Sequence, residues 1–185
     1  MKFCGIEKVF EGSFITRYNI HYKTESGADK IYEMISRNHH MEKEELSGTA
    51  ADAVVIVMHD ETGEKILLNR EFRMSVNEWV FNFPAGLIDE GETLEEAAAR
   101  ELVEETGLQL VEISEQWKES YSAVGFSNEK VKVVLGKAVG TIQASHSELE
   151  EIEAAWYSKE EVKKILETEM FAARTQAYCM MWCKQ

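Results

Sequence analysis

The sequence has little proline, little cysteine and no long apolar run, and each shortage excludes a class of protein. It contains one proline and three cysteines in 185 residues. An odd number of cysteines with no CxxC pair, namely Cys4, Cys179 and Cys183, argues against a disulfide framework and against a zinc site. The uninterrupted apolar runs, such as residues 53–58, are far too short to cross a bilayer, so no membrane span is expected.

Basic residues are also in short supply. The chain has 20 Lys and Arg against 34 Asp and Glu, which gives a net charge of −14 at pH 7. Because a general nucleic-acid binder needs a basic face, we expect no nucleic-acid partner and no anionic membrane surface. A small anionic substrate is compatible with this charge only if a cation screens the site. Glu7 and Lys8 interrupt the first apolar residues, so we expect no signal peptide and a cytoplasmic location.

The remaining composition predicts a globular α/β protein. At 44% hydrophobic residues, the chain can bury a real core. Residues 1–45 are expected to form an N-terminal module of antiparallel strands, and residues 46–185 the main domain. Residues 38–52 are interpreted as a polar linker in which His39 and His40 are solvated. Further strands are predicted at residues 53–60, 65–72, 78–83, 108–117, 130–140 and 152–157. Such a mixture of strands and helices predicts an α/β or α+β sandwich.

Two capping boxes predict where helices begin. Thr93 with Glu96 and Ser158 with Glu161 both have the S/T-x-x-E spacing. Gly107 is a natural C-cap for the first helix. The apolar residues of this helix that recur on one face are Leu94, Ala98 and Leu102. A third helix is expected over residues 171–182, and residues 86–91 are expected to be a loop.

Three glutamates give the first helix an acidic face. Glu101, Glu104 and Glu105 lie at i, i+3 and i+4, so they share one side. A bound hard cation would remove their repulsion, and Mg²⁺ or Mn²⁺ prefers such oxygen ligands. Arg100 follows Glu96 by four residues and precedes Glu104 by four, so it can orient this face, and the backbone carbonyl of Ala85 can add a ligand. Charge alone favours the alternative of a solvated acidic face.

The spacing around these glutamates favours the metal site. Residues 86–108 read GX5EX7REUXEEXGU with every fixed position filled. This is the Nudix box, and the chain resembles the Nudix hydrolases. The resemblance implies a Nudix α/β/α sandwich with a mixed sheet, and Mg²⁺- or Mn²⁺-dependent hydrolysis of a nucleoside diphosphate linked to another moiety. It also implies that Glu101 and Glu105 are the principal metal ligands, with Glu104 in support.

Other segments resemble the branch of ADP-ribose pyrophosphatases and nucleotide-sugar diphosphatases. These segments are REFR, FPAGLIDEGE, GFSNEK, EGSF and IYEMISR. The resemblance implies a homodimer paired through the N-terminal strands and a base stacked on Phe14 and Tyr32. It also implies phosphate contacts from Arg37 and Arg73, for which bidentate guanidinium groups are suited. For the two aromatics, ordinary sheet packing is an equal alternative.

The family resemblance also implies a general base or further metal ligand from an acidic loop after the box. Residues 145–151 fit this description, with Glu150 and Glu148 as candidates beside Glu104 and Arg100 in the catalytic set. Glu151 and Glu153 are interpreted as structural or solvated.

Two departures affect the expected substrate. Val124 and Asn82 stand where the ADP-ribose pattern has proline and glutamate, and both count against ADP-ribose as the specific substrate. ADP-ribose or another ADP-sugar still leads because of the segments quoted above, and UDP- or GDP-sugars are the alternative. A nucleoside monophosphate and a sugar phosphate would be the products. A mutagenic-nucleotide triphosphatase is less consistent with these segments. A Nudix-fold module that binds nucleotides without hydrolysis is the alternative from another class, and the intact box favours hydrolysis.

Overall fold

The computed structural model describes residues 1–48, 50–147 and 149–185, and the chain forms two compact units. The smaller unit comprises residues 1–52 and 119–131, and the larger comprises residues 53–118 and 132–185. Each unit has its own buried apolar cluster. The described residues include no helix that is both long enough and apolar enough to span a membrane.

Three antiparallel strands form the sheet of the smaller unit, as the sequence predicts. They are β1 (Lys2–Glu11), β2 (Thr16–Lys23) and β3 (Asp29–Ser36), in the order β1-β2-β3. The residues that form its core are Tyr18, Ile20, Met34 and Met41. Because Met41 lies beyond β3, the segment after the sheet contributes to the core.

This segment corrects the interpretation of residues 38–52 as a polar linker. It folds back on the sheet, where the Tyr18 hydroxyl donates to the Asn38 carbonyl at 2.7 Å, and it contains the 3₁₀ turn η1 (Lys43–Glu45). His39 is only partly exposed, and its Nδ1 lies 2.6 Å from the hydroxyl of the buried Thr16. The composition did not reveal this packing, because Met41 is the one buried residue among the described residues of this segment.

The larger unit is built on a single sheet with the order β11-β5-β4-β10-β8, in which β6 pairs with β5 and β7 with β4. Its strands are β4 (Ala53–His59), β5 (Lys65–Arg73), β6 (Glu78–Asn82), β7 (Ala85–Leu87), β8 (Gln109–Gln116), β10 (Lys130–Val139) and β11 (Ile152–Ser158). The short strand β9 (Ser120–Tyr121) belongs to the residues of the smaller unit and pairs with Lys130 and Val131 at the start of β10. Almost every residue of β4 is buried, which accounts for its unbroken apolar run.

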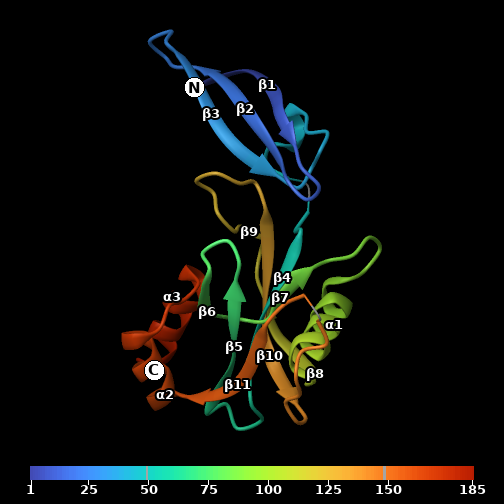
Figure 1. Ribbon diagram of the computed structural model, residues 1–185, viewed down its shortest axis with the longest axis vertical. Coiled ribbons are helices and arrows are strands. Elements are labelled where there is room, and N and C mark those ends of the chain that lie inside the picture. The colour runs from blue at the N-terminus through green and yellow to red at the C-terminus, as the bar shows by residue number, and fades with distance from the viewer. Residues whose placement is uncertain (49, 148) are drawn as a thin grey trace. The chain divides into compact units, whose positions relative to one another are not determined.

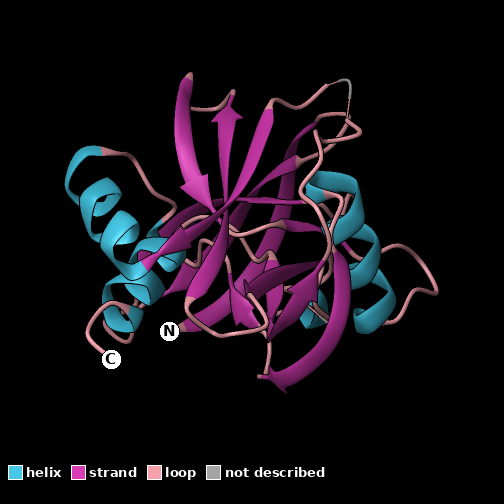
Figure 2. Cartoon of the chain, turned by 90° about the horizontal axis from the view of Figure 1, so that it is seen from below, coloured by secondary structure: helices cyan, strands magenta, loops and turns pink. Residues whose placement is uncertain are grey.

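Helices cover both faces of this sheet. Helix α1 (Leu94–Thr106) lies on one side, and α2 (Lys159–Thr168) and α3 (Ala173–Trp182) lie on the other (Figures 1 and 2). Both predicted capping boxes are present, and Gly107 ends α1 with a φ of 73°. Ala98 and Leu102 are fully buried against β4, and Leu94 packs at the edge of the same cluster. The α/β sandwich with an N-terminal antiparallel module is therefore confirmed.

One short strand replaces part of a predicted loop. Residues 85–87 form β7, in which Ala85 pairs with Val55 and Gly86 with Val54 of β4. Three residues are too few to produce a strand pattern in the sequence. The pairing matters for function because β7 packs directly against α1.

Candidate metal and active site

Glu105 is a buried carboxylate in the last turn of α1. Its residue is only 7% exposed, and Asn69 Nδ2 of β5 donates to its Oε2 at 2.6 Å. The backbone N–H of Ala85 also donates to this carboxylate. Burial raises the pKa of Glu105 to about 9, with a further contribution from the negative charges of Glu101 and Glu71. Within the described part of the chain, no lysine or arginine forms an ion pair with Glu105.

Glu101 lies one turn earlier on α1 and packs against β7. Burial raises its pKa, although Arg100 Nη1 donates to Oε1 at 2.7 Å and opposes that shift. A Cβ atom added to Gly86 would overlap the Glu101 carboxylate. Glycine is therefore required at position 86 so that the carboxylate can lie against the backbone of β7.

Arg100 binds the outer side of the same acidic group. Its Nε and Nη2 each lie 2.9 Å from an oxygen of Glu92, and Nη2 also donates to the Leu87 carbonyl at 2.9 Å. Hydrogen bonds from Arg100 lower the pKa of Glu92 to about 2. Arg100 also contacts Glu101 at 2.7 Å and Glu104 at 3.4 Å, so it lies beside the acidic face, and its orienting role stays a prediction.

Glu96 does not take part in this arrangement. Its carboxylate accepts from the backbone N–H and hydroxyl of Thr93 and closes the capping box at the start of α1. The four-residue spacing suggested a contact between Glu96 and Arg100. The Glu96 carboxylate is instead hydrogen bonded to Thr93.

The oxygen atoms of Glu101 and Glu105 suit a hard divalent cation. Both carboxylates face β7 from successive turns, and the overlap at Gly86 shows how closely the backbone approaches them. Glu104 is half exposed and lies further out. Across residues 1–48, 50–147 and 149–185, no group of three or more His, Cys, Asp or Glu side chains is arranged to hold a metal ion.

The acidic loop is attached to the end of α1. The backbone N–H groups of Gln143 and His146 donate to the carbonyls of Thr106 and Glu104, each at 2.9 Å. Glu150 is exposed, and its charge contributes to the raised pKa of Glu101. Glu148 lies outside the described residues. The loop therefore brings Glu150, one of the two predicted bases, close enough to influence Glu101 on the acidic face of α1, called here the metal face (Glu101, Glu104 and Glu105).

The remaining acids of this segment have other contacts. The Glu151 carbonyl accepts from the backbone N–H of Phe72, and the Glu153 carboxylate pairs with Arg70 at 3.2 Å. These contacts agree with the structural interpretation of both residues.

Strand β5 supplies residues that the sequence analysis missed. Asn69 is fully buried beside Glu105, and Glu71 is a buried carboxylate whose Oε1 accepts from Asn82 Nδ2 at 2.9 Å. Arg73, the predicted phosphate contact, is half exposed at the end of this strand. The polar residues at alternate positions 69, 71 and 73, directly after the apolar residues 66–68, were the signal that could have revealed them.

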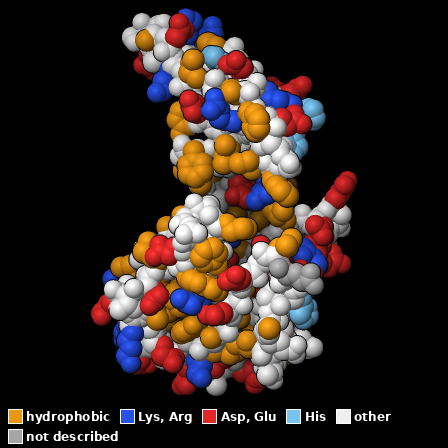
Figure 3. Space-filling view, in the orientation of Figure 1, with side chains coloured by type: hydrophobic (Ala, Val, Ile, Leu, Met, Phe, Trp, Pro, Cys, Tyr) orange, Lys and Arg blue, Asp and Glu red, His pale blue; other side chains and the backbone are white. Residues whose placement is uncertain are grey.

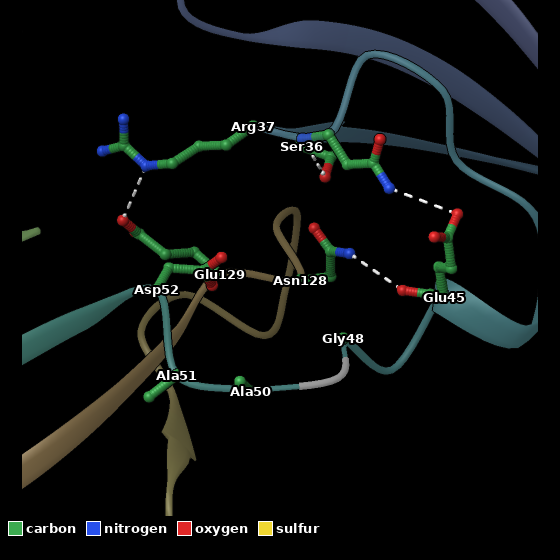
Figure 4. A pocket seen from close by; sticks show the side chains of 10 residues that line it. Ser36, Arg37, Glu45, Gly48, Ala50, Ala51, Asp52, Asn128 and Glu129 are labelled. Atoms are coloured by element: carbon green, nitrogen blue, oxygen red, sulfur yellow. Dashed lines mark hydrogen bonds and ion pairs between the residues drawn. The ribbon is translucent and has the colours of Figure 1, made fainter. Parts of the chain in front are cut away.

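The other predicted substrate contacts belong to the smaller unit. Arg37 donates to Glu129 at 3.2 Å and lines a pocket of about 170 Å³ with it (Figure 4). Phe14 is 80% exposed in the turn before β2, so ordinary sheet packing does not account for it. The Tyr32 ring is also exposed, and its hydroxyl donates to the Gly125 carbonyl.

Comparison with known proteins assigns this arrangement to a family. The family model for the NUDIX domain matches residues 49–179, which include the whole of the acidic motif. The chain belongs to the Nudix family. This confirms the resemblance of residues 86–108 to the Nudix box, and Nudix hydrolases generally use a divalent metal.

Individual Nudix relatives match to different extents. An ADP-ribose pyrophosphatase of Bacillus subtilis is 27% identical over 180 residues, 95% of this chain and 88% of that protein. An uncharacterized Nudix hydrolase of Schizosaccharomyces pombe is 28% identical over 116 residues, 63% of this chain. The chain spans 54% of the length of this yeast protein, and 44% and 26% of two further Nudix relatives, from Caenorhabditis elegans and Arabidopsis thaliana.

A solved structure supports the Nudix fold. The crystal structure of an ADP compounds hydrolase superposes with a TM-score of 0.72, covering 100% of this chain and 93% of the other. At 19% identity, this similarity concerns the fold.

Proposed function

We propose that this Nudix protein hydrolyses the diphosphate bond of a nucleoside diphosphate sugar, with ADP-ribose or another ADP-sugar as the leading substrate. The products would be a nucleoside monophosphate and a sugar phosphate. The observation that carries this proposal is the pair of carboxylates, Glu101 and Glu105, held against β7 with their negative charge incompletely balanced by Arg100. Relatives named ADP-ribose pyrophosphatase and ADP-sugar pyrophosphatase support the substrate class.

Mg²⁺, or Mn²⁺ in its place, is the proposed cofactor. Glu101 and Glu105 would be its principal ligands, Glu104 would support them, and the Ala85 carbonyl would add a backbone ligand. When bound, the ion neutralises the diphosphate, polarises a P–O bond and lowers the pKa of a water molecule. The close approach of β7 to the two carboxylates is what makes a backbone ligand reasonable.

Protein side chains would orient the reactants and move the proton. Arg100 fixes the Glu101 carboxylate by the 2.7 Å hydrogen bond from Nη1. Arg73 and Arg37 would bind phosphate oxygens, since a guanidinium group can bind two of them at once. Glu150 would accept the proton of the attacking water as its oxygen bonds to phosphorus and the P–O bond breaks. Glu148 is the second candidate for this base.

The smaller unit is proposed to bind the base and to form a dimer. Phe14 and Tyr32 would stack on the base, and residues 1–45 would pair two subunits, while residues 46–185 carry the hydrolytic site. The exposed apolar side chains that support an interface are Val9, Phe10, Phe14, Ile15, Ile31 and Tyr32, and Figure 3 shows hydrophobic groups on the visible face of this unit. Light scattering at micromolar concentration should give twice the chain mass, and a monomer would contradict the dimer.

A hydrolysis screen tests the proposal. Purified protein with Mg²⁺ would be incubated with ADP-ribose, ADP-glucose, UDP-glucose, GDP-mannose and nucleoside triphosphates, and products would be identified by chromatography. We expect AMP and a sugar phosphate from an ADP-sugar. Preference for UDP-glucose or GDP-mannose would support the alternative raised by Asn82 and Val124. Binding of these compounds without turnover would identify the non-hydrolytic module instead.

A further inference from the structure

Three residues of β5 form a polar row along one face of the sheet. Asn69, Glu71 and Arg73 alternate along the strand, so their side chains point to the same side. Asn69 donates to Glu105, which places the metal face of α1 on that side. The row changes from fully buried at Asn69 to half exposed at Arg73. It therefore leads from the metal carboxylates to the proposed phosphate contact.

The middle of this row is held by the neighbouring strand and by α3. Asn82 Oδ1 accepts from the Thr175 hydroxyl at 2.9 Å and from the Phe83 backbone N–H at 3.0 Å. With two donors on its oxygen, the Asn82 amide must direct its nitrogen towards Glu71, where it donates to Oε1 at 2.9 Å. All three polar side chains, those of Thr175, Asn82 and Glu71, belong to buried residues, so this connection is sheltered from water.

The second oxygen of Glu71 faces Arg73. Glu71 Oε2 lies 3.6 Å from Arg73 Nη1, and the side chains are 11% and 54% exposed. The buried Glu71 carboxylate is thus paired with the long, solvent-exposed side chain of Arg73. Ordering a free arginine on binding costs conformational entropy, and prior attraction to a fixed carboxylate reduces that cost.

We propose that Glu71 is a positioning residue that holds the Arg73 guanidinium ready for the substrate diphosphate, with Asn82 and Thr175 as its supports. This inference rests on the proposed function, because it assigns Arg73 to the diphosphate. It also gives a reason for asparagine at position 82. A glutamate there would put a second carboxylate beside Glu71, whereas the amide donates to it.

A double-mutant cycle tests the coupling between Glu71 and Arg73. Glu71→Gln keeps an acceptor for Asn82 but removes the charge that faces Arg73. We expect KM for ADP-ribose at saturating Mg²⁺ to rise about five- to tenfold with kcat changed less than about twofold, the pattern of lost binding energy. In an Arg73→Met background the same substitution should leave KM unchanged, because its effect passes through Arg73. Thr175→Val should cause a smaller rise in KM.

The control is the ion pair of Arg70, which points to the opposite face of β5, with Glu153 of β11. Glu153→Gln removes the 3.2 Å ion pair to Arg70, which has the same chemistry as the pair under test. It should leave KM within about twofold of wild type, and melting temperatures of all variants would separate folding from positioning. Equal KM effects of Glu71→Gln with and without Arg73 would overturn the proposal.

A readout without substrate separates this inference from the proposed function. The Nε–Hε signal of Arg73 in an NMR spectrum, assigned with Arg73→Lys, should shift and exchange faster with solvent in Glu71→Gln and in Thr175→Val. If wild-type protein hydrolyses no nucleotide sugar, the proposed function fails and this signal still decides whether Glu71 positions Arg73. A signal unchanged in both variants would contradict the positioning role.

Discussion

Glu92 and Glu105 belong to the same acidic motif, yet their surroundings shift their pKa values in opposite directions. Hydrogen bonds from Arg100 hold the pKa of Glu92 at about 2, whereas burial raises that of Glu105 to about 9. Arg100 thus neutralises one end of the motif within the chain. Among the described residues, the hydrogen bonds to Glu105 come from neutral donors, the Asn69 amide and the Ala85 N–H. The comparison indicates that Arg100 is the positive partner at the Glu92 end, whereas a proton or a bound cation has to take that part at the Glu105 end.

A single guanidinium is also insufficient for all the carboxylates it contacts. Arg100 donates to both Glu92 and Glu101, and more weakly to Glu104. Arg100 therefore does not provide a separate positive partner for each of the carboxylates around Glu101 and Glu105. Figure 3 shows acidic side chains gathered at the edge of the larger unit where α1 and the preceding loop lie. On the proposed function, a divalent cation between the protein and its substrate would allow a protein of net charge −14 to bind a diphosphate.

The largest effect is expected from removing the Glu105 charge. Glu105→Gln replaces the charged ligand with an amide of equal size, so turnover should fall by more than about 100-fold, beyond the loss typical of a residue that only supports a ligand. The variant should stay folded, because Asn69 can still be hydrogen bonded. Glu95→Gln, an exposed change in the first turn of α1, serves as the control. A steady-state rate near that of wild type at saturating Mg²⁺ would rule out the metal assignment.

Glu150→Gln should have the next largest effect. A general base is typically worth about 10²–10⁴-fold, so kcat should fall within that range while KM changes little. Glu151→Gln alters the neighbouring exposed residue and should keep wild-type kcat, since its carbonyl, which accepts from Phe72, is unaffected. A loss of less than about threefold in Glu150→Gln would move the search to Glu148 and then to the box glutamates.

Arg100→Lys removes hydrogen bonds to Glu92 and Glu101 and should have an intermediate effect on turnover. A lysine ammonium cannot bind both oxygens of Glu92 and also Glu101. Turnover should fall by about 10- to 100-fold, as is typical when a partner of a metal ligand is lost. Arg70→Lys, beside the exposed Glu153, is the matched control for the same chemical change. Rates within about twofold of wild type for Arg100→Lys would mean that Glu101 does not depend on the guanidinium.

The pH dependence of stability without metal tests the buried end of the motif separately from turnover. Glu105 has a folded-state pKa of about 9 and an ordinary value of 4.5, so the unfolded chain releases its proton first as pH rises. Unfolding free energy should therefore fall progressively between about pH 4.5 and 9, and Glu105→Gln should lack this fall. Urea unfolding of both proteins across this range measures the difference. Parallel profiles would show that Glu105 is not the group responsible.

Glu92 should contribute in the opposite direction. Its pKa of about 2 lies below the ordinary 4.5, so its stabilising contribution is present above about pH 4.5 and is lost as pH falls towards 2. The same unfolding series extended to acid, with Glu92→Gln, separates this loss from the effect of Glu105.

The sequence contained much of this site because the motif is local. The spacing of Glu101, Glu104 and Glu105 and the capping box at Thr93 lie within one helix, so helical periodicity is enough to place them. The Nudix box then identified the fold, since every fixed position of the motif is filled. One of these positions is Gly86, which has to be glycine because the Glu101 carboxylate lies against it.

What the sequence did not reveal depends on residues far apart in the chain. Only the packing of α1 against the sheet determines that Glu105 is buried beside Asn69 while Glu104 stays half exposed. The Glu71 carboxylate is held by Asn82 of β6, which is held in turn by Thr175 of α3. Helical periodicity cannot distinguish neighbouring positions at the edge of a buried stripe, and a three-residue strand such as β7 leaves no pattern.

Calorimetric titration with Mg²⁺ in the absence of substrate tests the central claim most directly. Wild-type protein and Gly5→Ala, which adds a Cβ in open space, should bind Mg²⁺ equally. Gly86→Ala, whose Cβ displaces the Glu101 carboxylate, and Glu105→Gln should each bind at least about tenfold more weakly while remaining folded. Equal Mg²⁺ affinity in all four proteins would contradict the assignment of Glu101 and Glu105 as the site that requires an external cation.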